Sequence, residues 1–326
     1  MTSKNIFKDM EEDINSSKID EQIKKKLFEN LFKLKEKKVN LMITGATGCG
    51  KSSTINAMFN TEVAKVGIGV DPETMDIQKY ELDNLILWDS PGLGDGKEKD
   101  IQHSKGIIRK LNELDENGNS LIDLVLVVLD GGSRDLGTSY ELINQVIIPN
   151  IGENAKDRVL IAINQADVAM KGRCWDYENN KPEPKLIEFL EQKVKSVKGR
   201  VKEATGVDVD PIYYSAGYKD GDEEQKPWNL SKLLYFIVKN TPSEKRLSYV
   251  NNISEEKEIW EDDDELMDYR EEVKKSFFET VVEHASESAD IGGSIGRVFG
   301  KTGETIGRAV GGTIGAIIGG IKSLFS

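Results

Sequence analysis

Short, almost uninterrupted apolar runs recur along this chain, and stretches with helical periodicity separate most of them. A strand buried on both faces of a parallel sheet lacks the apolar–polar alternation of a half-exposed strand. We therefore predict a three-layer α/β/α fold with a mostly parallel sheet. The predicted strands are 39–45, 85–89, 124–130, 159–164 and 212–216, and the predicted helices are 51–59, 101–114, 137–148, 184–204 and 229–239.

An amphipathic helix is predicted ahead of the first strand, within an N-terminal segment 1–38. Its apolar positions are Ile19, Ile23, Leu27, Leu31 and Leu34, and charged residues occupy the opposite face. We expect this helix to pack on the domain that follows, with partner binding or dimerisation as the alternative.

The chain changes character after Pro242, where the predicted nucleotide-binding domain (39–242) ends. Residues 243–290 are strongly acidic, with the run EDDDE at 261–265, and are expected to be helical. We interpret them as a solvated helix surface and spacer. The alternative is that they neutralise the basic residues of the last segment, 291–326, in a closed state.

The last segment repeats glycine at an interval close to one helical turn. Glycine disfavours a helix in water, but a glycine stripe lets two helices pack closely, as in G-x-x-x-G contacts. The uncharged part, 309–321, is too short to cross a hydrocarbon core of about 30 Å. Three interpretations stay open: membrane association through this glycine zipper, a helix pair docked on protein, or a flexible tail. The glycines are Gly292, Gly296, Gly300, Gly303, Gly307, Gly311, Gly315 and Gly319.

Composition narrows the classes of function. The chain has 326 residues and a net charge of −13, which argues against nonspecific nucleic-acid binding. Its cysteines, Cys49 and Cys174, make no disulfide framework, and the N-terminus lacks the apolar core of a signal peptide. We therefore expect a cytoplasmic protein, with conditional inner-membrane association through the tail.

The sequence GATGCGKS follows the first predicted strand and begins a predicted helix, the context that a phosphate-binding P-loop requires. Its glycines let the backbone approach phosphate oxygens, and the helix N-terminus attracts the anion. Lys51 is expected to contact the β- and γ-phosphates, and the Ser52 hydroxyl to bind Mg²⁺. The cofactor-binding set is Gly45, Ala46, Thr47, Gly48, Cys49, Gly50, Lys51, Ser52 and Ser53, of which Ser53 is expected to act structurally.

Two further stretches fit a nucleoside triphosphate with Mg²⁺. Asp89 ends a predicted strand in LILWDSPGLGDG, where a carboxylate can hold Mg²⁺ through water and the Gly92 N–H can contact the γ-phosphate. Thr74 lies in a loop ahead of a predicted edge strand, MDIQKYEL, and can complete the Mg²⁺ shell when the third phosphate is present. We assign Lys51, Thr74 and Gly92 to catalysis, and Ser52, Thr74 and Asp89 to the metal.

These motifs, followed by NQAD at 164–167, resemble the Era-like (TrmE-Era-EngA-septin-like) P-loop GTPases. Over roughly 20–245 the chain is most similar to the bacterial YfjP/YeeP-type GTPases, which are related to the immunity-related GTPases. The resemblance implies GTP or GDP as ligand, with Asp167 binding the guanine edge and Asn164 steadying its loop. Gln165 occupies the position where members of this family usually have a lysine, whose stem stacks on the base. In YSA at 214–216, Ser215 and Ala216 resemble the element that contacts the guanine oxygen.

Two departures from that pattern bear on hydrolysis. Leu93 stands where Ras-type enzymes have a glutamine that orients water, so we predict slow intrinsic hydrolysis. Gly48 stands where potassium-activated members have asparagine, which argues against potassium activation. The resemblance implies homodimerisation through the nucleotide face, with a catalytic group from His103, Arg109 or Arg134.

The sequence thus predicts a GTP-hydrolysing switch that controls dimerisation and a membrane-acting tail, with stress or phage defence as a candidate role. The alternative is a ribosome- or RNA-assembly GTPase, or a docking scaffold, whose tail binds protein. The acidic charge balance disfavours the ribosome- or RNA-assembly alternative.

Overall fold

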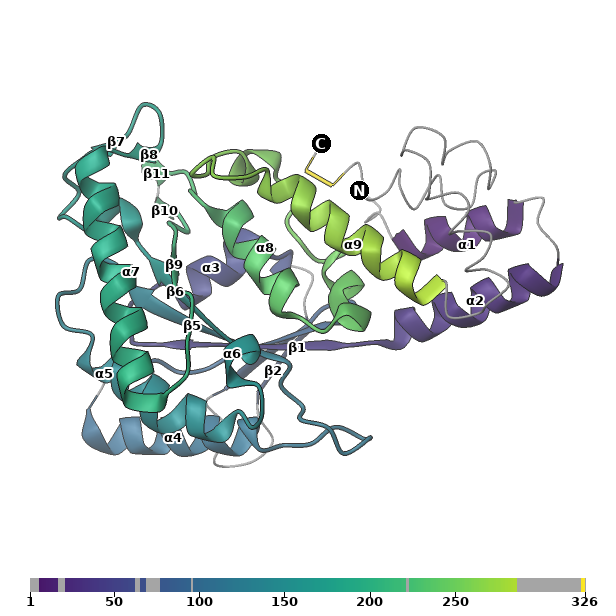
Figure 1. The fold of residues 1–326 in the computed structure, drawn as a ribbon, viewed down its shortest axis with the longest axis horizontal. Coiled ribbons are helices and arrows are strands. Elements are labelled where there is room, and N and C mark those ends of the chain that lie inside the picture. The colour runs from purple at the N-terminus through teal and green to yellow at the C-terminus, as the bar shows by residue number, and fades with distance from the viewer. Residues whose placement is uncertain are drawn as a thin grey trace.

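The predicted apolar runs form the strands of one sheet (Figure 1). The computed structural model describes residues 6–16, 21–61, 65–68, 77–94, 96–220, 223–285 and 324–325. Within these residues the sheet has seven strands in the order β2-β3-β4-β1-β5-β6-β9. They are β1 (Val39–Gly45), β2 (Lys65–Ile68), β3 (Gln78–Glu81), β4 (Leu85–Asp89), β5 (Leu124–Asp130), β6 (Val159–Asn164) and β9 (Ile212–Tyr213). The β4-β1-β5-β6-β9 part is parallel, as predicted, whereas β2 and β3 are antiparallel to their neighbours.

Helices cover both faces of the sheet because alternate residues of its central strands enter two different hydrophobic cores. Leu41 and Ile43 of β1 face one core, and Met42 faces the other. The first core lies under α3 (Lys51–Met58), α8 (Leu230–Asn240) and α9 (Tyr269–Ala285), and the second under α4 (Lys97–Leu111), α5 (Gly137–Glu141) and α7 (Pro184–Thr205). This arrangement confirms the predicted α/β/α class.

Smaller elements complete the described fold. Two hairpins, β7–β8 and β10–β11, were not predicted, nor was the short helix α6. The remaining helical turns are π-helical or 3-10. The bounds are α6 (Ala155–Arg158), β7 (Trp175–Asp176), β8 (Lys181–Pro182), β10 (Tyr218–Asp220), β11 (Glu223–Gln225), η2 (Leu142–Ile147), η3 (Ile148–Asn150), η4 (Ala166–Val168), η5 (Ser243–Tyr249) and η6 (Lys257–Trp260).

Three local predictions need correction. The strand predicted in MDIQKYEL is not an edge strand, because β2 pairs with its outer side. The helix predicted over 137–148 widens into a π-helical turn after Glu141. The strand predicted over 212–216 ends at Tyr213: Tyr214 is still hydrogen-bonded to Ile163 and Ala166, but Ser215 pairs with Trp228 instead.

The N-terminal segment forms two helices, α1 (Ile6–Ser16) and α2 (Glu21–Glu36), where the sequence predicted one. Leu31 and Leu34 of α2 are buried in the core under α3 and α8, as are Phe7 and Ile14 of α1. The prediction that this helix packs on the following domain is therefore confirmed for the described residues.

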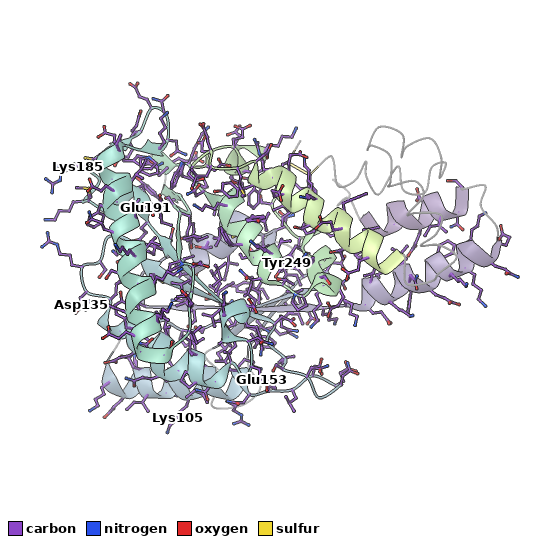
Figure 2. The ribbon with its side chains drawn as sticks, in the orientation of Figure 1. Lys105, Asp135, Glu153, Lys185, Glu191 and Tyr249 are labelled. Atoms are coloured by element: carbon purple, nitrogen blue, oxygen red, sulfur yellow. The ribbon has the colours of Figure 1, made fainter. Side chains whose placement is uncertain are left out.

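The acidic segment after Pro242 is not a solvated spacer over its described part, residues 243–285. Its side chains Tyr249, Trp260, Val273 and Phe277 are at most 1% exposed and belong to the core under α8. Tyr249 lies in the interior of the molecule (Figure 2), where its hydroxyl is hydrogen-bonded to Thr241. The net acidity of this stretch concealed its apolar positions, and its first half forms turns around η5 and η6 instead of a continuous helix.

The acidic run at 261–265 binds the first turn of α8 through an ion pair and hydrogen bonds. Lys232 forms an ion pair of 2.6 Å with Asp264, and both side chains are 12% exposed. Ser231 donates to Asp263, and the buried Asn229 accepts the Asp264 N–H while its own N–H donates to the Asp262 carbonyl. These contacts attach α9 to the end of the sheet that carries the predicted base-binding loop.

The chain end returns to the body at Leu324 and Phe325. Both pack on the core under α8, and the Phe325 ring meets Trp260 edge-on at 5.5 Å between centroids. The glycine-patterned residues 292–319 lie outside the described residues. Among the helices that are described, none has the length and apolar character needed to cross a bilayer.

Replacing Phe277 with alanine is expected to lower the free energy of unfolding by about 3–5 kcal/mol, because it opens a cavity in a fully buried site. Urea denaturation of the full chain measures this change. The control is Leu266→Ala, at a side chain that is 75% exposed, which should change stability by less than about 0.5 kcal/mol. Equal effects of the two variants would contradict the burial of the acidic segment.

Candidate functional site

The P-loop joins β1 to α3 at the carboxyl ends of the parallel strands, where ligands bind in such sheets. Gly50 precedes α3 with φ 88°, a left-handed conformation that glycine adopts without strain. A Cβ at this position would lie 2.2 Å from Nδ2 of Asn164. No side chain caps the helix at Gly50, so its first N–H groups are directed toward an anion site.

Lys51 and Ser52 begin α3 beside Asp89, which ends β4. The Lys51 ammonium donates to the carbonyls of Gly45 and Ala46 at 3.4 and 3.2 Å, folding the side chain over the loop. The Ser52 hydroxyl donates to Asp89 Oδ2 at 3.3 Å. Burial raises the pKa of Asp89, and the Lys51 charge and the Ser52 hydrogen bond oppose that shift.

The other carboxylate oxygen of Asp89 supports the predicted metal role. Asp89 is 9% exposed, and among the described residues its buried Oδ1 has no hydrogen-bond partner. A buried carboxylate oxygen without a partner is costly, and Mg²⁺ prefers oxygen ligands of this kind. Ser52 and Asp89 therefore fit the predicted Mg²⁺ site, whereas Thr74 lies outside the described residues.

Gly92 and Leu93 lie directly on the P-loop. The Thr47 N–H donates to the Leu93 carbonyl at 2.9 Å, and the Leu93 N–H donates to the Gly45 carbonyl at 3.3 Å. A Cβ on Gly92 would lie 2.4–2.6 Å from atoms of Thr47, so only glycine fits. The Leu93 side chain is 4% exposed and packs in the core under α4.

Asn164 connects the phosphate loop to the predicted base-binding loops. Its Nδ2 donates to the Cys49 carbonyl at 3.0 Å, and its Oδ1 accepts the Ala216 N–H at 2.9 Å. The Ala216 N–H, which the resemblance assigned to the guanine oxygen, is therefore hydrogen-bonded within the protein. Gln165 adds a second link, since its Nε2 donates to the Gly48 carbonyl at 3.0 Å.

Asp167 and Ser215 lie together at the base end of the site. The Ser215 hydroxyl donates to Asp167 Oδ1 at 2.7 Å, and both residues are nearly buried. The structure thus brings the residues predicted from GATGCGKS, NQAD and YSA to one edge of the sheet. Their roles toward a nucleotide stay predictions.

Lys193 of α7 is a residue of this region that no sequence motif indicates. Its half-buried ammonium donates to the carbonyls of Asp130, Gly131 and Ser133, at the end of β5 and in the loop that follows it. Burial lowers the pKa of Lys193, and the charge of Asp130 opposes the shift. The Gly131 N–H in turn donates to the Asn164 carbonyl at 2.8 Å, so Lys193 supports the strand end that carries Asn164.

The candidates for a catalytic group occupy different places. His103 reaches the Gly92 carbonyl at 3.1 Å, Arg109 lies in the last turn of α4, and Arg134 is exposed in the loop after β5. Cys49 is fully buried inside the P-loop, and burial raises the pKa of its thiol to about 11. The thiol is therefore protonated at neutral pH.

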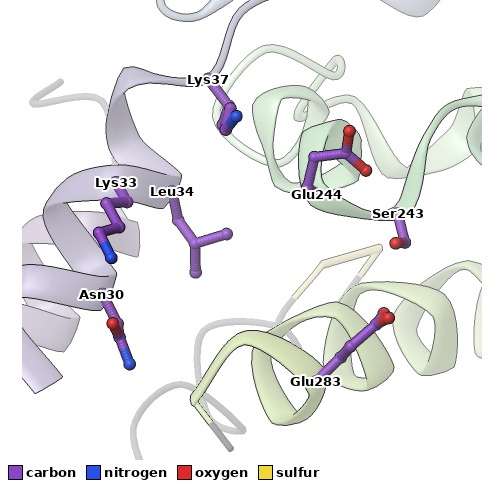
Figure 3. Close-up of a pocket in the computed structure, with 7 residues that line it drawn as sticks. All are labelled: Asn30, Lys33, Leu34, Lys37, Ser243, Glu244 and Glu283. Atoms are coloured by element: carbon purple, nitrogen blue, oxygen red, sulfur yellow. The ribbon is translucent and has the colours of Figure 1, made fainter. Parts of the chain in front are cut away.

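A separate cavity of about 390 Å³ lies near the amino end of β1, where α2 leads into the sheet. Figure 3 shows α2, η5 and α9 around it. Its lining residues are Asn30, Lys33, Leu34, Lys37, Ser243, Glu244 and Glu283. It shares no residue with the P-loop region.

Comparison with known proteins finds similar sequences over the region that contains the P-loop. Residues 40–165 match the sequence model of the family described as 50S ribosome-binding GTPase. Over these residues the chain is similar to P-loop GTPases. The match includes the P-loop, Asp89, Gly92 and Asn164, and it ends at Gln165, just before Asp167.

Two curated relatives are similar to this chain over part of their length. The chain is 31% identical to the uncharacterized protein YfjP of Escherichia coli (strain K12) over 131 residues, 39% of this chain and 41% of YfjP. It is 39% identical to interferon-inducible GTPase 1 of Mus musculus over 62 residues, 17% of this chain and 15% of that protein. The predicted similarity to YfjP is thereby confirmed, and the chain spans 41% of its length.

Among solved structures, the G domain of the T. maritima FeoB iron transporter is similar, with 20% identity and a TM-score of 0.35. The match covers 62% of this chain and 98% of that chain.

Asn164→Ala is expected to lower the free energy of unfolding by about 2–4 kcal/mol, since it leaves two buried backbone groups without partners. Urea denaturation without nucleotide measures the effect. The matched control is Gln165→Ala, which removes one exposed hydrogen bond and should cost less than about 1 kcal/mol. A loss at Asn164 no larger than at Gln165 would contradict the bridging role.

Proposed function

We propose that the protein binds GTP with Mg²⁺ and hydrolyses it slowly, as a molecular switch. The observation that carries the proposal is the pairing of Ser52 with Asp89 at the end of an uncapped α3, with one buried carboxylate oxygen left for a ligand. Guanine is the proposed base because Asp167 lies at the base end of the same sheet edge. The Era-like subclass is part of this proposal and rests on the resemblance of the motifs.

In this proposal Ser52 and Asp89 hold Mg²⁺, which supplies neutralising charge at the phosphates when bound. The chain's own groups do the rest of the work. The helix N-terminus and Lys51 bind and orient the phosphates, and the Gly92 N–H contacts the third phosphate. Slow hydrolysis follows from Leu93, whose side chain has no polar atom to position water.

A catalytic group supplied across a homodimer through the nucleotide face would compensate for Leu93. The exposed Arg134 is a candidate for this role, because it projects from a loop that adjoins the base-binding elements. Thr74 retains its proposed part in the Mg²⁺ shell.

For the tail, we propose conditional action on membranes, controlled by the nucleotide state, in a cytoplasmic protein. Support comes from the glycine pattern and from the basic residues among the apolar ones. The competing proposal is a tail that docks on protein. It is favoured by the contact of Phe325 with Trp260, which holds the chain end on the body.

Asp167→Asn is expected to shift nucleotide preference from GTP toward XTP, because the amide reverses the polarity of one hydrogen bond to the base edge. Binding of fluorescent GTP, XTP and ATP analogues to the full chain measures this preference. Lys51→Ala is the comparison variant, and it should weaken all of them together by at least about 100-fold. GTP binding unchanged in both variants would refute the proposed nucleotide site.

The tail proposal predicts that the full chain floats with anionic liposomes in one nucleotide state and that residues 1–290 do not float in any. Flotation with GTP, with GDP and without nucleotide measures this difference. Phe325→Ala should increase flotation without nucleotide if its contact with Trp260 restrains the tail. Absence of flotation for the full chain in every state would favour the protein-docking alternative.

A further inference from the structure

The backbone of Gly92–Gly94 is held from two sides. On the P-loop side, Leu93 exchanges the two hydrogen bonds with Gly45 and Thr47 described above. On the other side, α4 provides two side chains that reach back to the same loop. His103 Nδ1 lies 3.1 Å from the Gly92 carbonyl, and Asp100 Oδ1 accepts the Gly94 N–H at 2.8 Å.

The contact of His103 defines which ring nitrogen carries a proton. A carbonyl oxygen only accepts hydrogen bonds, so Nδ1 must donate to Gly92. His103 is half-buried in the second turn of α4. Its ring therefore forms a hydrogen bond within the protein, to the Gly92 carbonyl.

One peptide group is consequently fixed at both ends. In the peptide between Gly92 and Leu93, the N–H is held by the Gly45 carbonyl and the C=O by His103. Glycine has no side chain to restrict its rotation, so a backbone orientation at Gly92 needs such external contacts. Asp100 applies the same restraint one residue further on, at the Gly94 N–H.

The Gly92 N–H is the group that this arrangement leaves for a ligand. Among the described residues no hydrogen bond is recorded for it, whereas the neighbouring N–H groups of Leu93 and Gly94 are both occupied. Gly92 also lies against Thr47 of the P-loop, so its N–H is at the phosphate end of the site.

We propose that His103 and Asp100 are positioning residues: they fix the peptide groups on the carboxyl side of Gly92, so that the Gly92 N–H, which belongs to the preceding peptide group, is presented to the third phosphate of the nucleotide. This inference rests on the proposed GTP-binding function and deepens it. Neither side chain touches the nucleotide in this scheme. By fixing the Gly92 backbone, they allow the loop to discriminate GTP from GDP. The Leu93 side chain cannot do this, because it has no polar atom.

The test measures affinity of the full chain for GDP and for a non-hydrolysable GTP analogue, both with Mg²⁺. His103→Ala should lower the preference for the triphosphate about fivefold, the equivalent of one hydrogen bond, with GDP affinity unchanged. His103→Asn should restore the preference, because its Nδ2 takes the place of Nδ1. His103→Gln should not restore it, because its amide extends to the position of Nε2.

Asp100 and an exposed neighbour complete the experiment. Asp100→Ala should act in the same direction as His103→Ala, whereas Asp100→Asn keeps an acceptor oxygen and should behave as wild type. Because both residues hold one loop, the double alanine variant should lose less than the sum of the single losses. Gln102→Ala, at an exposed position between them, should have no effect.

The possible results distinguish failure of the positioning role from failure of the proposed GTP-binding function. If wild type binds neither nucleotide, the proposed function itself fails and the inference with it. If wild type prefers GTP and His103→Ala keeps that preference, or weakens GDP and GTP equally, the positioning role is wrong while the GTP-binding function stands. Failure of His103→Asn to restore the preference would also overturn it.

Discussion

The side-chain amide of Asn164 fixes the phosphate loop relative to the base-binding loops. One of its polar atoms holds the Cys49 carbonyl and the other the Ala216 N–H, and both bonds are buried. Gly50 must be a glycine at this junction because the Asn164 amide occupies the space of any Cβ. A second bridge runs parallel to it, since the Thr54 hydroxyl of α3 is bonded to the hydroxyl of the buried Tyr214 at 2.6 Å. The P-loop and the loops predicted to bind the base therefore form one rigid unit, and Lys193 supports it through the loop after β5.

The same unit extends into the C-terminal part of the chain. Ser215, which contacts Asp167, exchanges two backbone hydrogen bonds with Trp228. The next residue, Asn229, holds the backbone of Asp262 and Asp264. The base-binding loop, α8 and the turn that leads into α9 are thus joined by consecutive short contacts.

The sequence predicted the parallel sheet and the phosphate site because each depends on local pattern. A buried parallel strand is apolar throughout, and the P-loop needs its glycines and Lys51 in a fixed order. The acidic segment was misinterpreted because its core contacts are few, widely spaced and surrounded by charge, as with Trp260 and Phe277. Lys193 was not selected, and His103 was selected only as a candidate catalytic group and not for its contact with Gly92. Each acts on backbone carbonyls of a distant segment, and such a contact requires no particular partner residue and leaves no motif.

In the proposed function, the loop at Leu93 lacks a catalytic side chain but would still be sensitive to the third phosphate through its backbone. Its side chain points into the core under α4, so a glutamine here would bury an amide among apolar residues instead of placing it beside the nucleotide. Packing in this core is therefore a sufficient explanation for leucine at this position, and no loss of a catalytic glutamine needs to be assumed. The backbone of the same residue is what contacts the P-loop, through both its N–H and its carbonyl. In the proposed function, sensing by the backbone and chemistry by a side chain are therefore separable at this loop: the backbone of Gly92 and Leu93 would do the first, and a group from outside the loop the second.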